Sequence, residues 1–243
     1  MWFWKKKIVH EVKLDWLHTD MHSHLIPGID DGAKTMEESI ELINGFVALG
    51  YKKIITTPHI LWEMYPNTRE RILNGVEALR QTVREQQIDV EVSAAAEYFI
   101  DEHFKNLLQE KAPLLTLKEN LVLVEFSMIT APMDLQEVIF EMQVQNYQPI
   151  IAHPERYIYL KNKKAFFEQL KEGGAQFQLN LLSLVGYYGN SVQELAEYIL
   201  KKGLYDYAAT DLHGKRHLDA LQKLGNSPLY PLLQESSLKN SLL

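Results

Sequence analysis

The stretch that decides the fold is residues 20–32, which read Asp-Met-His-Ser-His-Leu-Ile-Pro-Gly-Ile-Asp-Asp-Gly. Its first five residues are predicted to form a strand, and alternate side chains of a strand leave the same face. His22 and His24 would therefore lie side by side and could share one metal ion. The chain then turns at Pro27-Gly28 and brings two carboxylates back toward the imidazoles. Mixed nitrogen and oxygen donors suit divalent cations, but a His-x-His pair alone is weak evidence, so the remaining chain must decide.

Length and composition narrow the class of protein. The chain has 243 residues, 46% of them hydrophobic, which suits one large domain with a full core. Its 25 Lys and Arg against 32 Asp and Glu give a net charge of −7, which argues against nucleic-acid binding. The absence of cysteine excludes disulfides, thiolate zinc sites and cysteine-nucleophile phosphatases. An anionic substrate would need local positive charge, such as bound metal.

The N-terminal residues 1–18 mix aromatic and charged side chains without a clear period and are interpreted as a lead-in segment. Residues 2–7, Trp-Phe-Trp-Lys-Lys-Lys, allow contact with an anionic membrane, but packing on the chain's own domain or a partner subunit is the favoured interpretation. The order of aromatic and basic residues does not match a signal peptide, and no window reaches the roughly 20 apolar residues of a membrane span. A cytoplasmic location is therefore expected.

Strands and helices are expected to alternate from residue 19 to residue 243 as one domain. The expected strands cover residues 20–24, 52–59, 90–98, 121–126, 148–154, 175–180 and 205–213. Helices are expected over 35–49, 67–87, 101–110, 165–171 and 191–202, with another starting at Pro132, and with Thr35 and Asn67 as caps. This alternation predicts parallel β/α units, and seven of them favour a distorted (β/α)7, TIM-like barrel, although an open sheet has the same periodicity.

Metal-ligating side chains recur at the ends of these strands. Six of the seven expected strands finish with His, Asp or Glu, and active sites of β/α barrels lie at the C-terminal ends of the strands. One such residue alone is more often an ordinary polar strand end. Together, nine donors fit two or three ions, with Mn²⁺, Fe²⁺ and Zn²⁺ left open. The nine are His22, His24, Asp31, His59, Glu97, Glu125, His153, Asp211 and His213.

Two arginines follow expected ligands at the same spacing. Arg156 comes three residues after His153, and Arg216 comes three residues after His213. On loops at the mouth of the cavity, each guanidinium could hold a phosphate oxygen bidentately. The alternative for either arginine is a surface ion pair, for example with Glu155.

The ordered motifs resemble the polymerase and histidinol phosphatase (PHP) superfamily, and within it the CpsB/CapC branch of bacterial tyrosine-protein phosphatases. The motifs are Asp20-Met-His-Ser-His24 with Asp30-Asp-Gly32, Thr57-Pro-His59, Ala96-Glu-Tyr98, Val124-Glu-Phe126, Ala152-His-Pro-Glu-Arg156 and Thr210-Asp-Leu-His213. The resemblance implies a PHP-type barrel with three metals, usually manganese, in which the nine donors are the ligands and Glu125 bridges. It also implies that Arg156 and Arg216 bind phosphate. The chain departs from the family pattern at Ala33, where the family has proline, and in a shorter loop before Arg216.

The function implied is hydrolysis of phosphotyrosine on the tyrosine-rich tail of a membrane-associated kinase in capsular or exopolysaccharide synthesis. A water molecule activated by metal would attack phosphorus directly, which agrees with the missing cysteine. Two other functions stay open at this point. One is a small-molecule phosphatase of the same superfamily that acts on histidinol phosphate or a similar ester, and the other is a non-catalytic metal-binding scaffold.

Overall fold

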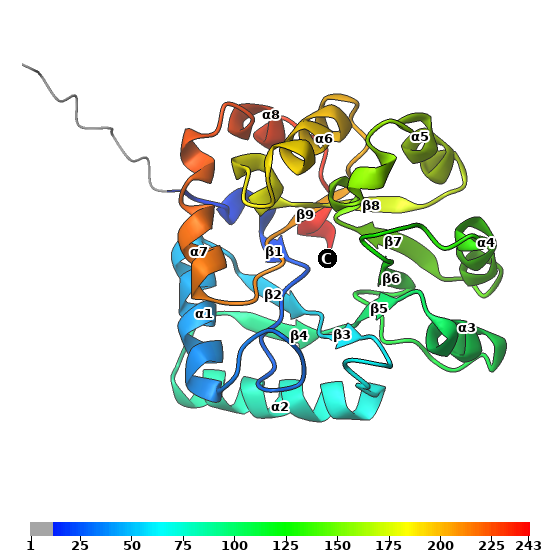
Figure 1. The fold of residues 1–243 in the computed structure, drawn as a ribbon. Coiled ribbons are helices and arrows are strands. Elements are labelled where there is room, and N and C mark those ends of the chain that lie inside the picture. Colours follow the sequence, from blue (N-terminus) through cyan, green and yellow to red (C-terminus); the bar gives the residue numbers. More distant parts are fainter. Residues whose placement is uncertain (1–11) are drawn as a thin grey trace, which may run out of the picture.

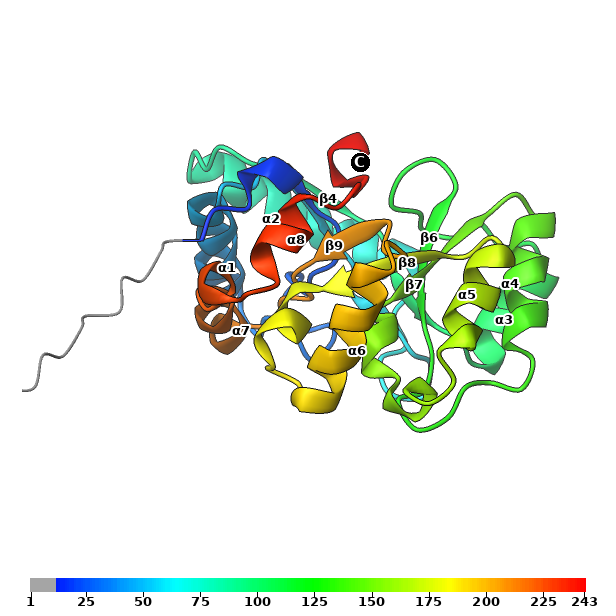
Figure 2. The same ribbon diagram turned by 90° about the horizontal axis from the view of Figure 1, so that it is seen from above.

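Parallel strands form a ring with helices around it in the computed structural model, which describes residues 12–243 (Figure 1). The view from above shows the helices as an outer layer around the strands (Figure 2). Within residues 12–243, no helix is both long enough and apolar enough to cross a membrane. The N-terminal residues 2–7, for which membrane contact was considered, lie outside the described residues.

Two parallel sheets make up the ring. One has the order β1-β2-β4 and the other the order β3-β5-β6-β7-β8-β9. The strands are β1 (Thr19–Asp20), β2 (Lys53–Thr56), β3 (His59–Ile60), β4 (Glu91–Ala94), β5 (Glu97–Phe99), β6 (Leu121–Glu125), β7 (Gln148–Ala152), β8 (Gln176–Asn180) and β9 (Tyr207–Ala209). All pairs between them are parallel, as the alternation of strands and helices predicts.

Two of the predicted strands are each broken in two, which the sequence analysis did not anticipate. The stretch 52–59 divides into β2 and β3 at Pro58, and the stretch 90–98 divides into β4 and β5 beside it. Proline has no N–H to continue a ladder. The two neighbouring segments stay hydrogen-bonded across the break, because Ala95 N donates to Thr56 O at 2.9 Å and Glu97 N donates to Pro58 O at 3.2 Å. The break therefore kinks the ring without opening it.

The ring closes where β1 meets β9, and few strand hydrogen bonds are made there. The predicted strand 20–24 pairs regularly only over β1, after which His24 N donates to Leu212 O and Asp211 N donates to His22 O, each at 2.9 Å. In β1 itself, the Asp20 carboxylate accepts a hydrogen bond of 2.8 Å from Thr210 N, just beyond the end of β9. This junction, which we call the seam, makes the fold a closed, distorted barrel.

A buried asparagine connects the two strands at the other end of the seam. Asn240 donates from Nδ2 to Thr19 O at 3.0 Å and to Ala208 O at 2.6 Å, and its Oδ1 accepts from Ala208 N at 3.0 Å. The C-terminal segment, for which docking was expected, thus lies against the base of the barrel, and the C-terminus appears inside the ring in Figure 1.

The helices up to α6 begin and end close to the expected positions, whereas α7 was not predicted. They are α1 (Met36–Leu49), α2 (Arg69–Glu85), α3 (Glu102–Gln109), α4 (Leu135–Val144), α5 (Ala165–Glu172), α6 (Asn190–Lys201), α7 (Lys215–Leu221) and α8 (Tyr230–Gln234). Thr35 caps α1 as predicted. The expected cap of α2 was wrong, because Thr68 accepts from Arg71 N while the buried Asn67 donates to Ile29 O and His59 O. The helix expected from Pro132 begins three residues later.

The core includes part of the expected lead-in segment. Val12, Leu14 and Leu17 are buried among the side chains of the barrel. Their burial removes apolar surface from water and so attaches this segment to the domain. The domain boundary at residue 18 stays a prediction.

Candidate metal centre and active site

All nine predicted donors converge at the C-terminal ends of the strands. They form four overlapping groups whose donor atoms lie within 4.8 Å of one another: His24-Asp31-His59-His213, His22-His24-Asp211, His22-Glu97-His153 and His59-Glu97-Glu125. The adjoining cavity has a volume of about 480 Å³. A ring of parallel strands explains the convergence, because it brings residues far apart in sequence to one end.

The group His22-His24-Asp211 is built on the His-x-His pair. The Nε2 atoms of His22 and His24 lie 3.3 Å apart, so the two rings do share one face. The Nε2 atom of His22 also lies 3.1 Å from a Glu97 oxygen and 3.2 Å from an Asp211 oxygen. Donors about 2.0–2.2 Å from one ion lie roughly 3.0–3.5 Å from each other. The spacing therefore suits a shared cation.

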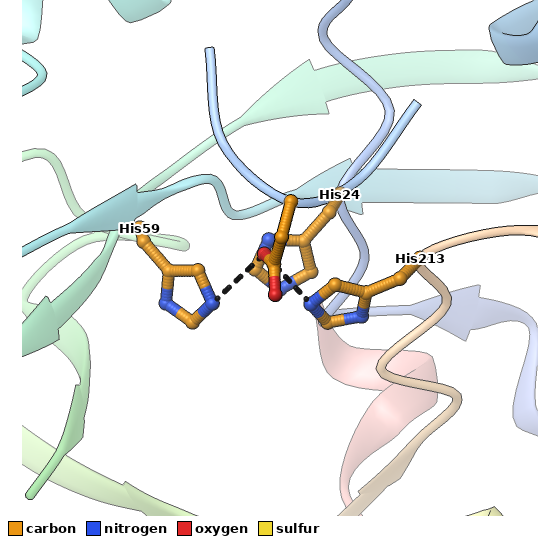
Figure 3. Close-up of side chains that lie close together, drawn as sticks. His24, His59 and His213 are labelled. Carbon is orange, nitrogen blue, oxygen red and sulfur yellow. Dashed lines mark ion pairs between the residues drawn. The ribbon is translucent and has the colours of Figure 1, made fainter. Parts of the chain in front are cut away.

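The group His24-Asp31-His59-His213 lies nearer the solvent. Figure 3 shows His24, His59 and His213 converging from three parts of the chain. The half-exposed Asp31 carboxylate lies between two of them, 3.5 Å from His59 Nε2 and 3.3 Å from His213 Nε2. The turn after the first strand does place this carboxylate beside the imidazoles. Ala33 N donates to His24 O at 3.1 Å, a hydrogen bond that the proline of the family pattern lacks.

Glu97 is the carboxylate that the remaining groups share. Its oxygens lie 3.1 Å from His153 Nε2 and 3.0 Å from His59 Nδ1, in addition to the contact with His22. Glu125 lies 3.1 Å from His59 Nδ1 but 3.8 Å from His153 Nε2. Glu97 belongs to two of the four groups and Glu125 to one. The geometry thus favours Glu97 over Glu125 as the shared carboxylate.

Buried polar atoms without hydrogen bonds show that this donor set fits metal ions. Glu97 Oε2, His59 Nδ1 and His153 Nδ1 are buried and have no hydrogen-bond partner. The first two lie only 3.0 Å apart, yet their directions do not form a hydrogen bond. Buried polar atoms are almost always satisfied. Of these three atoms, Glu97 Oε2 and His59 Nδ1 lie among other donors, which is the arrangement expected around a cation.

Proton charges balance the carboxylates when no cation is bound. Burial acts to lower the pKa of His22, but the charges of Glu97 and Asp211 outweigh it and raise that pKa to about 10. Burial likewise acts to raise the pKa of Glu97, and the charges of His22 and His59 hold it well below its usual value. The pKa of Asp211 is lowered well below its usual value in the same way. Cations entering the site would replace these protons.

Neutral and acidic side chains behind the donors fix the histidine rings. The His22 Nδ1 atom lies 2.9 Å from Gln178 Oε1, and the His24 Nδ1 atom lies 2.8 Å from Asp30 Oδ2. Asn180 donates from Nδ2 to Asp211 Oδ2 at 2.8 Å. The sequence did not indicate Gln178 and Asn180, which lie on β8 and belong to the one predicted strand that does not finish with His, Asp or Glu. Partners of this kind orient metal ligands and tune their basicity.

The two predicted arginines occupy different pockets. Arg156 lines the cavity, donates from Nη1 to Asp211 Oδ2 at 2.9 Å and has its guanidinium carbon 4.5 Å from the centre of the Tyr188 ring. Glu155 is no partner for Arg156, because it is buried and accepts from Asn180 N and from Ser183 and Tyr205.

Arg216 is exposed in the first turn of α7 and lines a neighbouring pocket with Lys34, outside the cavity. His217 lines the cavity in its place, with Nδ1 3.1 Å from Asp211 O. The sequence indicates neither His217 nor Tyr188, because aromatic side chains in these positions have no diagnostic spacing.

Backbone strain marks two of the donors. His153 has φ of 34° and Asp211 has φ of 51°, both in the left-handed region that non-glycine residues rarely adopt. His153 comes directly after β7, and Asp211 comes two residues after the end of β9. Such strain persists where the surrounding structure holds it, and it is frequent at functional sites. Gly32 is needed nearby, because a Cβ there would lie 2.2 Å from His24 O.

Comparisons with known proteins identify the family of this chain. Residues 18–222 match the family model described as "Capsular polysaccharide synthesis, CpsB/CapC". The chain belongs to the CpsB/CapC family. Among its relatives are the tyrosine-protein phosphatase YwqE of Bacillus subtilis, 27% identical over 80% of this chain and 76% of YwqE, and CpsB of Streptococcus pneumoniae, 28% identical over 80% of this chain and 82% of CpsB.

Solved structures support the same fold for the CpsB/CapC chain. A crystal structure from work on YwqE and CpsB, described as unique metal-dependent tyrosine phosphatases, superposes with a TM-score of 0.81 at 26% identity. It covers 92% of this chain and 90% of its own. A lactonase from Listeria monocytogenes shares the fold alone, with a TM-score of 0.56 at 14% identity over 96% of this chain and 94% of its own.

Proposed function

We propose that this chain is a metal-dependent tyrosine-protein phosphatase that acts in capsular or exopolysaccharide synthesis. The observation that carries the proposal is the convergence of nine donors and Arg156 on one cavity in a CpsB/CapC family member. The relatives named as tyrosine-protein phosphatases support phosphotyrosine over histidinol phosphate as the substrate. Converging donors with unsatisfied atoms also argue against a scaffold without catalysis.

The nine donors are the residues that would hold the metal. Buried His22, Glu97, His153 and Asp211 serve the inner groups, whereas Asp31, His59 and His213 serve the group nearer solvent. Their mixed nitrogen and oxygen donors would suit Mn²⁺, Fe²⁺ or Zn²⁺ in two or three positions, and the resemblance to the CpsB/CapC family supports Mn²⁺ among them. Divalent cations in such a site lower the pKa of a water molecule toward neutrality and polarise phosphoryl oxygens.

The side chains around the cavity position the substrate. Arg156 is held between Asp211 and the Tyr188 ring, with its guanidinium facing the cavity, where it binds a phosphoryl oxygen and stabilises charge in the transition state. Phe99 and Phe126 form part of the apolar wall that receives the tyrosine ring. Because a phenol has a pKa near 10, its oxygen leaves with less help from a general acid than an alkoxide needs.

The phosphoprotein substrate is proposed to be the tyrosine-rich tail of a bacterial tyrosine kinase, at the cytoplasmic side of the membrane. The resemblance to the CpsB/CapC branch supports this partner, and the open cavity, about 480 Å³ in volume, agrees with access by an exposed protein tail. Nothing in this proposal requires the chain itself to bind the membrane.

The decisive experiment measures metal content and turnover on the same samples. Purified protein supplied with Mn²⁺ should hydrolyse a phosphotyrosine peptide far faster than histidinol phosphate. Glu97→Gln should lose bound metal by elemental analysis and lose turnover, whereas Glu172→Gln, at an exposed position on α5, should keep both. Faster hydrolysis of histidinol phosphate than of the phosphotyrosine peptide would contradict the proposed substrate and favour a small-molecule phosphatase. Absence of any phosphatase activity in metal-loaded protein would favour the scaffold.

A further inference from the structure

We propose that a groove beside the catalytic cavity binds a lysine or arginine of the polypeptide that carries the phosphotyrosine. The groove, called here the Trp62 groove, has a volume of about 410 Å³ and lies between Leu61–Glu63, the start of α3 and the segment Pro132–Asp134. The inference rests on the proposed function, because it concerns how the same active site selects its protein substrate.

The Trp62 groove is continuous with the catalytic cavity. Leu61 and Phe99 line both, so the two spaces share a wall at the ends of β3 and β5. A polypeptide with its phosphotyrosine in the cavity must leave through the mouth, and an extended chain advances roughly 3.3–3.6 Å per residue. The groove is therefore reached by residues within about four positions of the phosphotyrosine.

An aromatic platform is already formed in the groove. Trp62 is 45% exposed, and its ring stacks on His103 with centroids 3.9 Å apart and planes 17° apart. Asp101 fixes both partners, because it accepts from Trp62 N at 3.2 Å and from Phe104 N at 2.8 Å in the first turn of α3. A cation over a tryptophan ring is attracted to it. Because the platform is preformed, binding does not have to order it.

The charge around the platform is negative. Four carboxylates line the groove against one lysine, Lys105, which pairs with Glu102 and with Asp134. Glu63 has no ion-pair partner anywhere in residues 12–243 and lies next to Trp62 in the chain. The excess charge attracts a basic side chain and repels an acidic one. Phosphate in the cavity and a basic group in the groove thus define one substrate pattern.

The test uses a set of phosphotyrosine peptides and a small ester. Lysine, alanine or glutamate is placed in turn at each of the four positions on either side of the phosphotyrosine, and kcat/KM is divided by that for p-nitrophenyl phosphate. At one or two positions on one side, we expect lysine to lower KM roughly three- to tenfold relative to alanine. Glutamate there should raise KM, with kcat little changed.

Variants connect this preference to the groove. Trp62→Ala and the double variant Glu63→Gln/Glu102→Gln should abolish the preference for lysine in the normalised values. The matched double variant Glu110→Gln/Glu172→Gln removes two exposed charges from the C-terminal ends of α3 and α5 and should keep the preference. Circular dichroism and metal content, measured on each variant, identify any that fail to fold, and such a variant is replaced by Glu63→Gln alone.

The outcomes separate this inference from the proposed function. Efficient turnover of all peptides without regard to charge overturns the Trp62 groove and leaves the tyrosine phosphatase intact. A preference that persists in both groove variants also overturns it. Failure of every phosphotyrosine peptide, with p-nitrophenyl phosphate still hydrolysed, overturns both proposals.

Discussion

The Oε1 atom of Gln178 lies 2.9 Å from the Nδ1 atom of His22, and both side chains are fully buried. The amide Nε2 of Gln178 donates to Leu179 O at 2.6 Å, which directs its oxygen toward the imidazole. In the neutral ring that can bind a metal, His22 Nδ1 therefore carries the proton, and Nε2 is left free facing Glu97 and Asp211. A glutamine from a strand without any charged end thus decides which nitrogen of a predicted ligand is available.

Replacing Gln178 should weaken metal binding without unfolding the barrel. In Gln178→Leu, the His22 ring loses its acceptor, and we expect metal affinity to fall about 10–100-fold. Competition with a coloured chelator measures the change. Gln176→Leu is the matched control, because Gln176 is on the same strand and its Oε1 has no hydrogen-bond partner. Equal affinities for the two variants would contradict the role of Gln178.

Arg156 and Arg216 should differ sharply in their effect on turnover. Arg156→Ala removes a guanidinium that faces the cavity, and we expect kcat/KM for a phosphotyrosine peptide to fall about 10²–10³-fold with metal content retained. Arg216→Ala removes an exposed side chain from the neighbouring pocket and should change kcat/KM less than about twofold. Steady-state kinetics on both variants checks this, and a large loss in Arg216→Ala would return that residue to the phosphate site.

Metal binding should release protons at neutral pH. Without a cation, the raised pKa values of His22, about 10, and of His59 keep both imidazoles protonated at pH 7. A ligand must lose its proton to bind, so proton competition weakens as pH rises and metal affinity should increase from pH 6 to pH 8. Calorimetric titration in two buffers of different ionisation enthalpy counts the protons. Identical heats in both buffers would show that the imidazoles are already neutral.

Asn240 should contribute strongly to stability although it is far from the cavity. Asn240→Ala removes three hydrogen bonds at the seam and leaves Ala208 N buried without a partner, which should cost about 2–4 kcal/mol of unfolding free energy. Urea denaturation measures the loss. Asn226→Ala, at an exposed position, is the control and should stay within about 0.5 kcal/mol of the parent.

The donor set could be predicted because His, Asp and Glu are residue types that commonly bind metal ions. His59 or Asp211 at a strand end is informative by type, and a ring of parallel strands then brings such residues together. The amides of Gln178 and Asn180 could not be predicted, since amides at strand ends have no metal chemistry of their own. Spacing placed Arg216 equivalently to Arg156, but the first turn of α7 directs His217 into the cavity instead.

The breaks between β2 and β3 and between β4 and β5 could not be predicted from the sequence for a related reason. Pro58 indicates where a ladder stops, and the run 52–59 was accordingly expected to end near it. The sequence does not reveal that pairing resumes one residue later with β5, or that the neighbouring strand breaks at the same level. Such a kink depends on how two neighbouring strands pair, whereas the periodicity of the sequence describes each strand by itself.

The seam has a consequence for the order in which the molecule assembles. Thr210 and Asp20 are 190 residues apart, and His22 and Asp211 lie on opposite sides of this junction. Closing so long a loop is slow, and synthesis delivers the two edges at very different times. A nascent chain therefore carries seven of the nine donors before Asp211 and His213 are synthesised, and the group His22-His24-Asp211 is complete only once the last strand has reached the first.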